Sequence, residues 1–404
     1  MHPMIKMMIV LAIFQSVHGL DADEIAALKD LQSEWEWSLD WEGAPSCAWQ
    51  GLSCDSDGHL VTMYLPFSQL TGTIPDSFGN LVHLVWVNLQ GNSLSGPLPA
   101  SLGNLVHIRR ILFASNQFSG PLPSSLGALR NLTVLTLDSN SFTGNVPISF
   151  VNLTSLTSIS LDDNRLSGQL SEDIFTSRMP LLDFSIDNNF ISGSIPSSLF
   201  SLPSLYSVSA INNLLEGTIP DSISNLSSVV DINFSHNKIA GTIPSSIASC
   251  LSLASLSLGY NLLTGSIPDT LGLLKNLAFV DLSHNRLTGP LPSRLLQLPL
   301  LESLFLSQNS LNCPLPAFQL SSNSPLINLD LSHNQLSSVL PSSICSPLLP
   351  DLYIDLTFNS FSGPIPDCIC QLSAPFGQIC PVGGPSTRYS CPIPACCYGY
   401  IKCV

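Results

Sequence analysis

One asparagine recurs every 24 or 25 residues along most of the chain, and this repeat constrains the fold more than any other feature. Around each asparagine lies the same frame, LxxLxLxxN, as in residues 132–140, and a degenerate turn precedes the series at residues 63–75. A unit this short cannot bury its own apolar face, so the repeats must stack on one another. The pattern predicts a solenoid of about thirteen turns. The repeated residues are Asn92, Asn116, Asn140, Asn164, Asn189, Asn213, Asn237, Asn261, Asn285, Asn309, Asn334 and Asn359.

Each position of the frame has a physical reason. Leu135 and Leu137 alternate with Thr136 and Asp138, which is the period of a strand, so the leucines should point inward and the other two outward. Successive strands should stack in parallel. The asparagine follows the strand, where its amide can satisfy backbone groups that the loop would leave unpaired. We therefore expect a structural ladder of asparagines, with Gly and Pro shaping the return segment.

With this frame the sequence resembles the plant-specific leucine-rich-repeat proteins, whose pattern is LxxLxxLxLxxNxLxGxIP. The resemblance covers about residues 21–370 and includes an N-terminal cap, where CAWQGLSC at residues 47–54 is similar to the family's CxWxGxxC. It implies an α/β solenoid: a right-handed leucine-rich-repeat superhelix with a parallel β-sheet on the concave face and Cys-containing caps. Members include receptor-kinase ectodomains, receptor-like proteins and secreted polygalacturonase inhibitors. The resemblance implies that the ligand binds on the concave face.

The chain is expected to fall into four segments. Residues 1–19 read as a signal peptide, with Lys6 before a short apolar stretch and small residues near the cleavage site. Residues 20–59 form the N-terminal cap, which begins with a short helix opened by a capping box of Asp21 and Glu24. Residues 60–370 hold the repeats, and 371–404 form a Cys-rich tail that matches no usual C-terminal cap. Since no later stretch is apolar enough to span a bilayer, we expect an extracellular protein of the apoplast or cell wall.

Composition narrows the class of partner. Only 10% of the residues are charged, and the net charge is −15, from 28 acidic and 13 basic side chains. Such a surface repels nucleic acid and anionic membranes and favours basic partners. We predict no nucleic-acid role and no cofactor.

Twelve cysteines in an exported chain indicate disulfides. Cys47 and Cys54 lie in the one cap motif and are predicted to be bonded. Cys345 and Cys370 occupy equivalent positions in adjacent turns, and one solenoid step fits the usual Cα separation of about 4.4 to 6.8 Å, so a second bridge is predicted there. Cys250 replaces an inward leucine and should be a buried free thiol.

Four sequons agree with a secretory route: Asn131, Asn152, Asn225 and Asn233. Asn233 lies between the inward Ile232 and Phe234, so its side chain should face the concave surface. A glycan there would block the middle of that face, whereas Asn152 and Asn225 lie on return segments and should carry sugar without affecting binding.

An acidic column is the first candidate site. Asp138, Asp162 and Asp187 share one outward position in three consecutive turns. Asp163 and Asp183 add two more carboxylates beside them and make an acidic patch. Carboxylates this close could in principle form a retaining glycosidase pair, at about 5 to 5.5 Å. An open sheet offers no pocket to hold a sugar, so a docking patch for a basic partner or cation and a merely solvated face remain the two readings. Several other turns place Ser or Thr at this position, which favours the docking patch.

Two further groups of residues share the outward face. His236, His284 and His333 precede ladder asparagines, but they lie two strand spacings, about 10 Å, apart, so no zinc ion can reach all three and we predict no metal site. Outward aromatic residues gather in the C-terminal half and are typical interface anchors, and packing against neighbours on the sheet is the alternative for some of them. They are Tyr206, Tyr260, Phe279, Phe305, Tyr353 and Phe358, and a smaller patch in the N-terminal half joins Trp86, Arg109 and Arg110.

These features predict a secreted recognition protein in defence or developmental signalling, not an enzyme. It should bind a protein, peptide or wall-derived ligand on its concave face, and inhibition of a microbial wall-degrading enzyme is the best specific mechanism. A structural protein of the cell wall or matrix is one alternative. The other is the ectodomain-like part of a receptor whose anchor is missing from this chain.

Overall fold

The computed structural model describes residues 19–35, 41–317, 324–345, 352–364, 366 and 388–389. It divides into two compact units, residues 1–156 and 157–404. The predicted signal peptide falls outside the described residues up to position 18. So do Cys370 of the predicted second bridge and the predicted tail, apart from residues 388–389.

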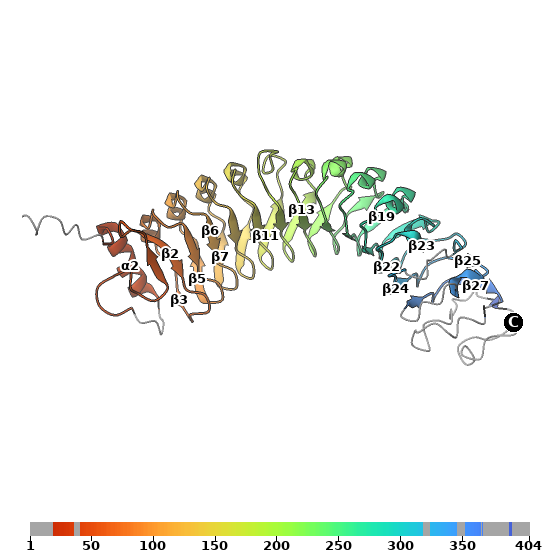
Figure 1. The fold of residues 1–404 in the computed structure, drawn as a ribbon, viewed down its shortest axis with the longest axis horizontal. Helices are drawn as coiled ribbons and strands as arrows, with labels where there is room; N and C mark the ends of the chain where they lie inside the picture. Colours follow the sequence, from red (N-terminus) through yellow and green to blue (C-terminus); the bar gives the residue numbers. More distant parts are fainter. Residues whose placement is uncertain are drawn as a thin grey trace, which may run out of the picture. The chain divides into compact units, whose positions relative to one another are not determined.

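The N-terminal cap begins unit 1. Helix α2 (Ala22–Glu34) starts with the predicted capping box: Asp21 accepts a hydrogen bond from Glu24 N, and Glu24 accepts one from Asp21 N. Its apolar side buries Ala27, Leu28 and Leu31. After it, β1 (Leu52–Cys54) pairs antiparallel with β2 (Leu60–Tyr64). Figure 1 shows α2 beside β2, at the red end of the chain.

Each unit then contains a parallel sheet with one strand per turn, as the frame predicts (Figure 1). In unit 1, β2 is followed by β4 (Trp86–Asn88), β6 (Arg110–Leu112) and β8 (Val134–Thr136). Neighbouring strands pair without any shift in register, so equal positions of the frame lie side by side. The strands of unit 2 are β10 (Ser158–Ser160), β12 (Asp183–Ser185), β14 (Ser207–Ser209), β16 (Asp231–Asn233), β18 (Ser255–Ser257), β20 (Phe279–Asp281), β22 (Ser303–Phe305), β24 (Asn328–Asp330) and β26 (Tyr353–Asp355).

The return segments form a second set of short parallel strands, which often contain a glycine such as Gly144 with φ +74°. Those of unit 1 are β3 (Thr71–Gly72), β5 (Ser93–Pro97), β7 (Gln117–Pro121) and β9 (Ser141–Gly144). Those of unit 2 are β11 (Arg165–Gln169), β13 (Phe190–Ser194), β15 (Leu214–Glu216), β17 (Ala240–Gly241), β19 (Leu262–Ser266), β21 (Arg286–Gly289), β23 (Ser310–Leu311), β25 (Ser337–Ser338), β27 (Ser360–Gly363) and β28 (Arg388–Tyr389).

A short 3-10 helix closes most turns, and the proline before it sets the extended entry, as Pro99 does before η2. These helices are η1 (Asp76–Asn80), η2 (Ala100–Asn104), η3 (Ser124–Ala128), η4 (Ile148–Asn152), η5 (Ser197–Ser201), η6 (Asp221–Asn225), η7 (Ser245–Ser249), η8 (Asp269–Leu273), η9 (Leu295–Gln297) and η10 (Ser342–Cys345). The leucines of the frame are buried between the strands and these segments, and Leu135 and Leu137 have no exposed surface.

The asparagine ladder is structural, as predicted. Asn237 donates from Nδ2 to the carbonyl of Ala210 in the preceding turn at 2.8 Å, and its Oδ1 accepts from Leu215 N at 2.9 Å. The amide also bonds its own turn at Phe234 O. One side chain thus satisfies backbone groups of two turns that are buried away from water.

Both cysteine predictions that the described residues can test are confirmed. Cys47 and Cys54 are bonded, with their Cα atoms 5.7 Å apart. Cys250 is a buried free thiol whose Sγ lies 3.2 Å from Ile223 O. Burial raises the pKa of Cys250 to about 11.

Candidate ligand-binding face

The side chains of the main sheet that point away from the core form what we call the open sheet face. Each turn contributes four of them: the first and third residues of the strand, then the two residues before the ladder asparagine. We call these positions one to four. In the turn of β12 they are Asp183, Ser185, Asp187 and Asn188.

The open sheet face of unit 2 is acidic. From position 158 to position 358 these four positions carry no Lys or Arg. They carry eight aspartates: Asp162, Asp163, Asp183, Asp187, Asp231, Asp281, Asp330 and Asp355. The outward positions of the main-sheet strands therefore present negative charge with no Lys or Arg among them, which attracts cationic groups.

Two carboxylates of the predicted acidic column bind the next turn of the solenoid. Asp162 Oδ1 accepts hydrogen bonds from Ser185 Oγ and from Asp187 N, both at 2.6 Å. One turn later, Asp187 Oδ1 accepts from Ser209 Oγ and Ile211 N, again at 2.6 Å. Asp138 lies in unit 1 and is half-buried.

In other turns, a different residue accepts the hydrogen bond from the backbone N–H at position three. In turns further along, the aspartate at position two of the same turn accepts it: Asp281 from Ser283 N, and Asp330 from Ser332 N, both at 2.9 Å. Asp355 does the same for Thr357 N. The aspartates at position three therefore have a structural role, which the comparison with the Ser and Thr of other turns did not consider. In four of the turns with Ser or Thr at position three, the acceptor is at position two instead: Asn233, Asp281, Asp330 or Asp355.

The environment of Asp187 combines opposing effects on its pKa. Burial raises the pKa of this carboxyl, the hydrogen bonds from Ser209 and Ile211 lower it, and the charges of Asp162 and Asp163 raise it. The net pKa lies above the usual value of 3.8. Asp163 itself is exposed and accepts a hydrogen bond from Asn188 Nδ2 at 2.9 Å.

Two further aspartates of the face lie at the first residue of their strands. Asp183 and Asp231 occupy position one of β12 and β16, with Ser207 of β14 between them. Asp183 is exposed and Asp231 half-exposed. Their carboxylates are thus presented to solvent at the same end of alternate strands.

Position four holds a row of stacked rings. Tyr260 lies between His236 and His284, with ring centroids 4.1 and 3.8 Å away and nearly parallel planes. Each of the three has a positive φ between 51° and 56°, a conformation that this position adopts in turn after turn. His333 and Phe358 stack in the same way at 4.1 Å. The structure therefore joins residues that the sequence had treated as separate histidine and aromatic groups.

The other predicted aromatic residues lie elsewhere on the face. Phe279 at position one and Phe305 at position two of the next strand approach diagonally, with centroids 5.7 Å apart. Tyr206 is 52% exposed and directly precedes β14, whereas Tyr260 follows β18, so the two flank opposite ends of their strands. Tyr353 begins β26. The predicted aromatic set therefore forms separate contacts and not one patch.

In unit 1, Trp86 packs edge-on against Tyr64 with centroids 5.3 Å apart. Arg110 pairs in register with Trp86 on the next strand, and both Arg110 and Arg109 are exposed. Trp86 and the two arginines of the smaller predicted patch therefore lie on adjacent strands, next to one another.

The sequons differ in accessibility. Asn152 and Asn225 are exposed at the ends of η4 and η6. Asn131 is exposed, but its Nδ2 donates to Val106 O at 2.8 Å. Asn233 is half-buried on the open sheet face, where its Oδ1 accepts from Ser235 N and Oγ.

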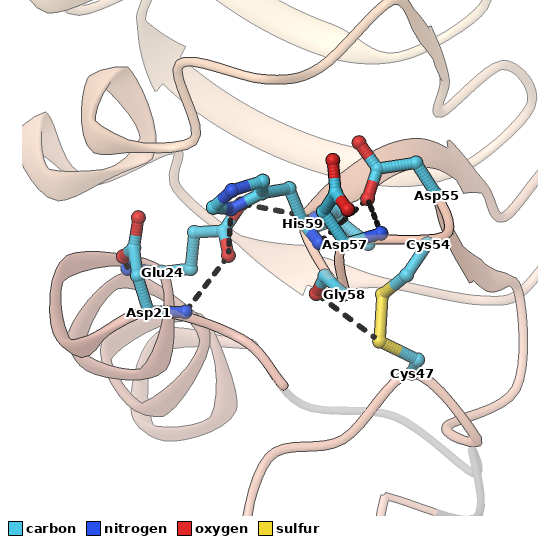
Figure 2. A network of polar contacts seen from close by, with 9 residues as sticks. Asp21, Glu24, Cys47, Cys54, Asp55, Asp57, Gly58 and His59 are labelled. Carbon is cyan, nitrogen blue, oxygen red and sulfur yellow. Dashed lines mark hydrogen bonds and ion pairs between the residues drawn. A yellow bond between two sulfur atoms is a disulfide. The ribbon is translucent and has the colours of Figure 1, made fainter. Parts of the chain in front are cut away.

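A polar network that the sequence reasoning missed lies in the cap (Figure 2). Glu24 is fully buried and accepts hydrogen bonds from Asp21 N at 3.1 Å and from Leu60 N at 2.9 Å. Asp55 accepts from the backbone N–H groups of Asp57 and His59. Partial desolvation raises the pKa of Asp55, but these bonds outweigh it and hold the pKa below its usual value. Of this network, the sequence spacing predicted only the capping box of Asp21 and Glu24.

Within the described part of the chain, no helix is both long and apolar enough to cross a bilayer.

Comparison with known proteins supports the fold. The Leucine Rich Repeat family profile matches seven stretches: residues 83–105, 131–153, 228–250, 252–274, 276–298, 325–347 and 352–372. A probable leucine-rich-repeat receptor-like serine/threonine-protein kinase of Arabidopsis thaliana is 47% identical over 36 residues, which are 9% of this chain and 5% of that protein.

Two solved structures illustrate the likeness. The plant peptide hormone receptor RGFR1, in complex with RGF2, has a TM-score of 0.72 and 31% identity over 80% of this chain and 50% of its own. The ectodomain of the Arabidopsis receptor kinase HAESA, in complex with an extended IDA peptide hormone, has a TM-score of 0.66 and 28% identity over 94% of this chain and 68% of its own. This chain spans half the length of the RGFR1 chain. The chain therefore contains leucine-rich repeats and has the leucine-rich-repeat fold of these plant receptor ectodomains.

Proposed function

We propose that this protein is an extracellular recognition protein whose open sheet face in unit 2 binds a basic peptide or a basic protein segment. The single observation that carries the proposal is the charge of that face: eight aspartates and no Lys or Arg at the four outward positions of its turns. The peptide complexes of RGFR1 and HAESA support a peptide as the class of ligand.

The chemistry of the face suggests how such a ligand would be held. The carboxylates of the exposed Asp183 and the half-exposed Asp231 would pair with Lys or Arg side chains. The ring row of His236, Tyr260 and His284 supplies flat, partly exposed surfaces. Arginine stacks on such rings through cation–π attraction, worth about 0.5 to 1 kcal/mol at an exposed site. Aromatic residues are also the usual anchors of binding energy in interfaces.

The protein is proposed to act by binding and not by catalysis. The carboxylates of Asp162 and Asp187 that resemble a catalytic pair are engaged with Ser185, Ser209 and two backbone N–H groups, so they hold the turns together. We place the protein in the apoplast or cell wall, in developmental or defence signalling. Inhibition of a wall-degrading enzyme would use the same acidic face against a basic enzyme surface.

A charge variant tests this proposal without disturbing the ladder. Asp183→Asn with Asp231→Asn removes two charges from the face. Asp173→Asn with Asp269→Asn removes two exposed charges from return segments and serves as the matched control. The wild type should bind an Arg- and Lys-rich peptide from a secreted-peptide library, and binding should weaken as salt rises, because exposed charges are screened over about 8 to 10 Å.

The face variant should lose at least threefold in affinity for that peptide and the control variant should lose none, by calorimetric titration. Equal affinities of the two variants, or binding indifferent to salt, would refute the acidic face as the ligand site. A parallel titration with purified polygalacturonases distinguishes enzyme inhibition from peptide recognition.

A further inference from the structure

A column of histidines runs along unit 1 at the edge of its main sheet. His59, His83 and His107 come from consecutive turns. The rings of His59 and His83 stack with centroids 3.8 Å apart, and those of His83 and His107 lie 6.3 Å apart and almost parallel. Histidine is a common metal ligand, and two histidines supply half of the ligands of a typical four-coordinate zinc site.

A carboxylate from the cap completes a set of three ligands. Asp21 precedes α2, and one ligand atom each from Asp21, His59 and His83 lie within 4.8 Å of one another. In a tetrahedral zinc site with bonds of about 2.0 to 2.1 Å, ligand atoms lie about 3.3 Å apart. To reach zinc-binding distances, the three ligand atoms must therefore approach one another by about 1.5 Å or less. Rotation of the half-exposed His83 ring out of its stack can supply this movement.

The environment of His59 favours a ligand role. Its Nδ1 is buried and has no hydrogen-bond partner, and it faces Glu24 Oε2 at 3.7 Å. Figure 2 shows the His59 ring beside the Glu24 carboxyl, next to Asp21 at the start of α2. Glu24 is fixed by the N–H groups of Asp21 and Leu60. A buried carboxylate behind a histidine is the usual partner that orients a metal-binding ring and raises its basicity.

We propose that Asp21, His59 and His83 bind one divalent zinc ion, with Glu24 as the positioning carboxylate behind His59. Two nitrogen ligands and one carboxylate suit zinc, whereas calcium and magnesium prefer oxygen ligands alone. His83 also lines an open hollow of about 300 Å³ together with Asp55, His107 and Arg109. The fourth position of the ion would hold water there or a ligand atom from outside the chain.

The ion would connect the N-terminal cap to the first two turns of the solenoid, because its ligands come from the residue before α2, the residue before β2 and the turn of β4. The prediction of no metal site considered only the column of His236, His284 and His333. The present cluster combines residues 38 and 24 positions apart, so no short motif revealed it.

Zinc binding to the full secreted chain tests the proposal. The protein carries a tag without histidine, is freed of metal with a chelator and is titrated with zinc chloride at pH 7 in a calorimeter. We expect one ion per chain. His83→Gln and Asp21→Asn should each weaken binding at least tenfold, whereas His107→Gln, from the same column, should not. Asn keeps the side-chain acceptor that caps α2, so the Asp21 variant should retain the helix.

Thermal unfolding distinguishes a built site from loose surface binding. Zinc should raise the thermal unfolding temperature of the wild type and of His107→Gln, but not of His83→Gln, since an ion that binds only the folded state stabilises it. No zinc uptake by the wild type, or equal uptake by all variants, would overturn the proposal.

Discussion

Removing the Asp187 carboxylate tests the structural role of the acidic column. Asp187→Ala deletes the acceptor of two hydrogen bonds, from Ser209 Oγ and from Ile211 N. A half-buried donor left without a partner costs about 1 to 3 kcal/mol. We therefore expect a loss of about 1 to 3 kcal/mol in the free energy of unfolding of unit 2.

Asp187→Asn is the matched comparison, because the amide oxygen can still accept from Ile211 N. It also removes the repulsion by Asp162 and Asp163, which raises the pKa of this carboxyl together with burial. A carboxyl with a raised folded-state pKa contributes stability below its unfolded value, near 3.8, and loses that contribution as pH rises through the folded pKa. At pH 7 the Asn variant should thus match or slightly exceed the wild type, and the difference should disappear below about pH 4.

Urea unfolding at pH 7 measures both variants. Since repeat arrays can unfold in segments, hydrogen exchange of the Ile211 amide provides the local measurement. Its protection should fall in the Ala variant and persist in the Asn variant. Equal stabilities of the Ala and Asn variants, with unchanged protection at Ile211, would show that the carboxylate is not a structural acceptor.

Asn237→Ala should lower the free energy of unfolding by about 1 to 3 kcal/mol in urea titration, because Leu215 N and Ala210 O lose their partner. Cys250 should resist alkylation at pH 8 in the folded protein and react on unfolding, since burial raises its pKa to about 11. Burial, together with the charges of His236 and His333, lowers the pKa of His284 below 6.5 in spite of Asp281 and Asp330. The folded chain should therefore lose stability as pH falls through 6.5, and less so in His284→Gln, a residue already present at this position as Gln308.

The repeat made the fold predictable because each position of the frame has one physical purpose. Inward leucines such as Leu135, the ladder asparagines and the capping box at Asp21 follow from periodicity and local hydrogen bonding alone. The register also followed, since equal positions of a repeat must pair. The leucines and asparagines are also repeated along the chain, and the ladder asparagine occurs twelve times.

The candidate site was less predictable, because it depends on side chains that interact between turns. The repeat places Asp187 one turn before Ser209 and Ile211. It does not show that the carboxylate points toward the Ser209 hydroxyl and the Ile211 N–H. It shows Tyr260 between two histidines at 24-residue intervals, yet the stack depends on the backbone conformation that position four adopts. The cluster of Asp21, His59 and His83 required knowing how the cap lies against the first turns.

The two uses of aspartate explain how a structural requirement can shape recognition. A backbone N–H that points toward the open sheet face needs an acceptor, and Asp281, Asp330 and Asp355 provide it within their own turns. Asparagine also suffices, as Asn233 shows. Each aspartate therefore adds a negative charge that the hydrogen bond itself does not require. A face built in this way repels acidic ligands before any specific contact forms, and replacing Asp281, Asp330 and Asp355 by Asn should preserve the fold while reducing the preference for basic peptides.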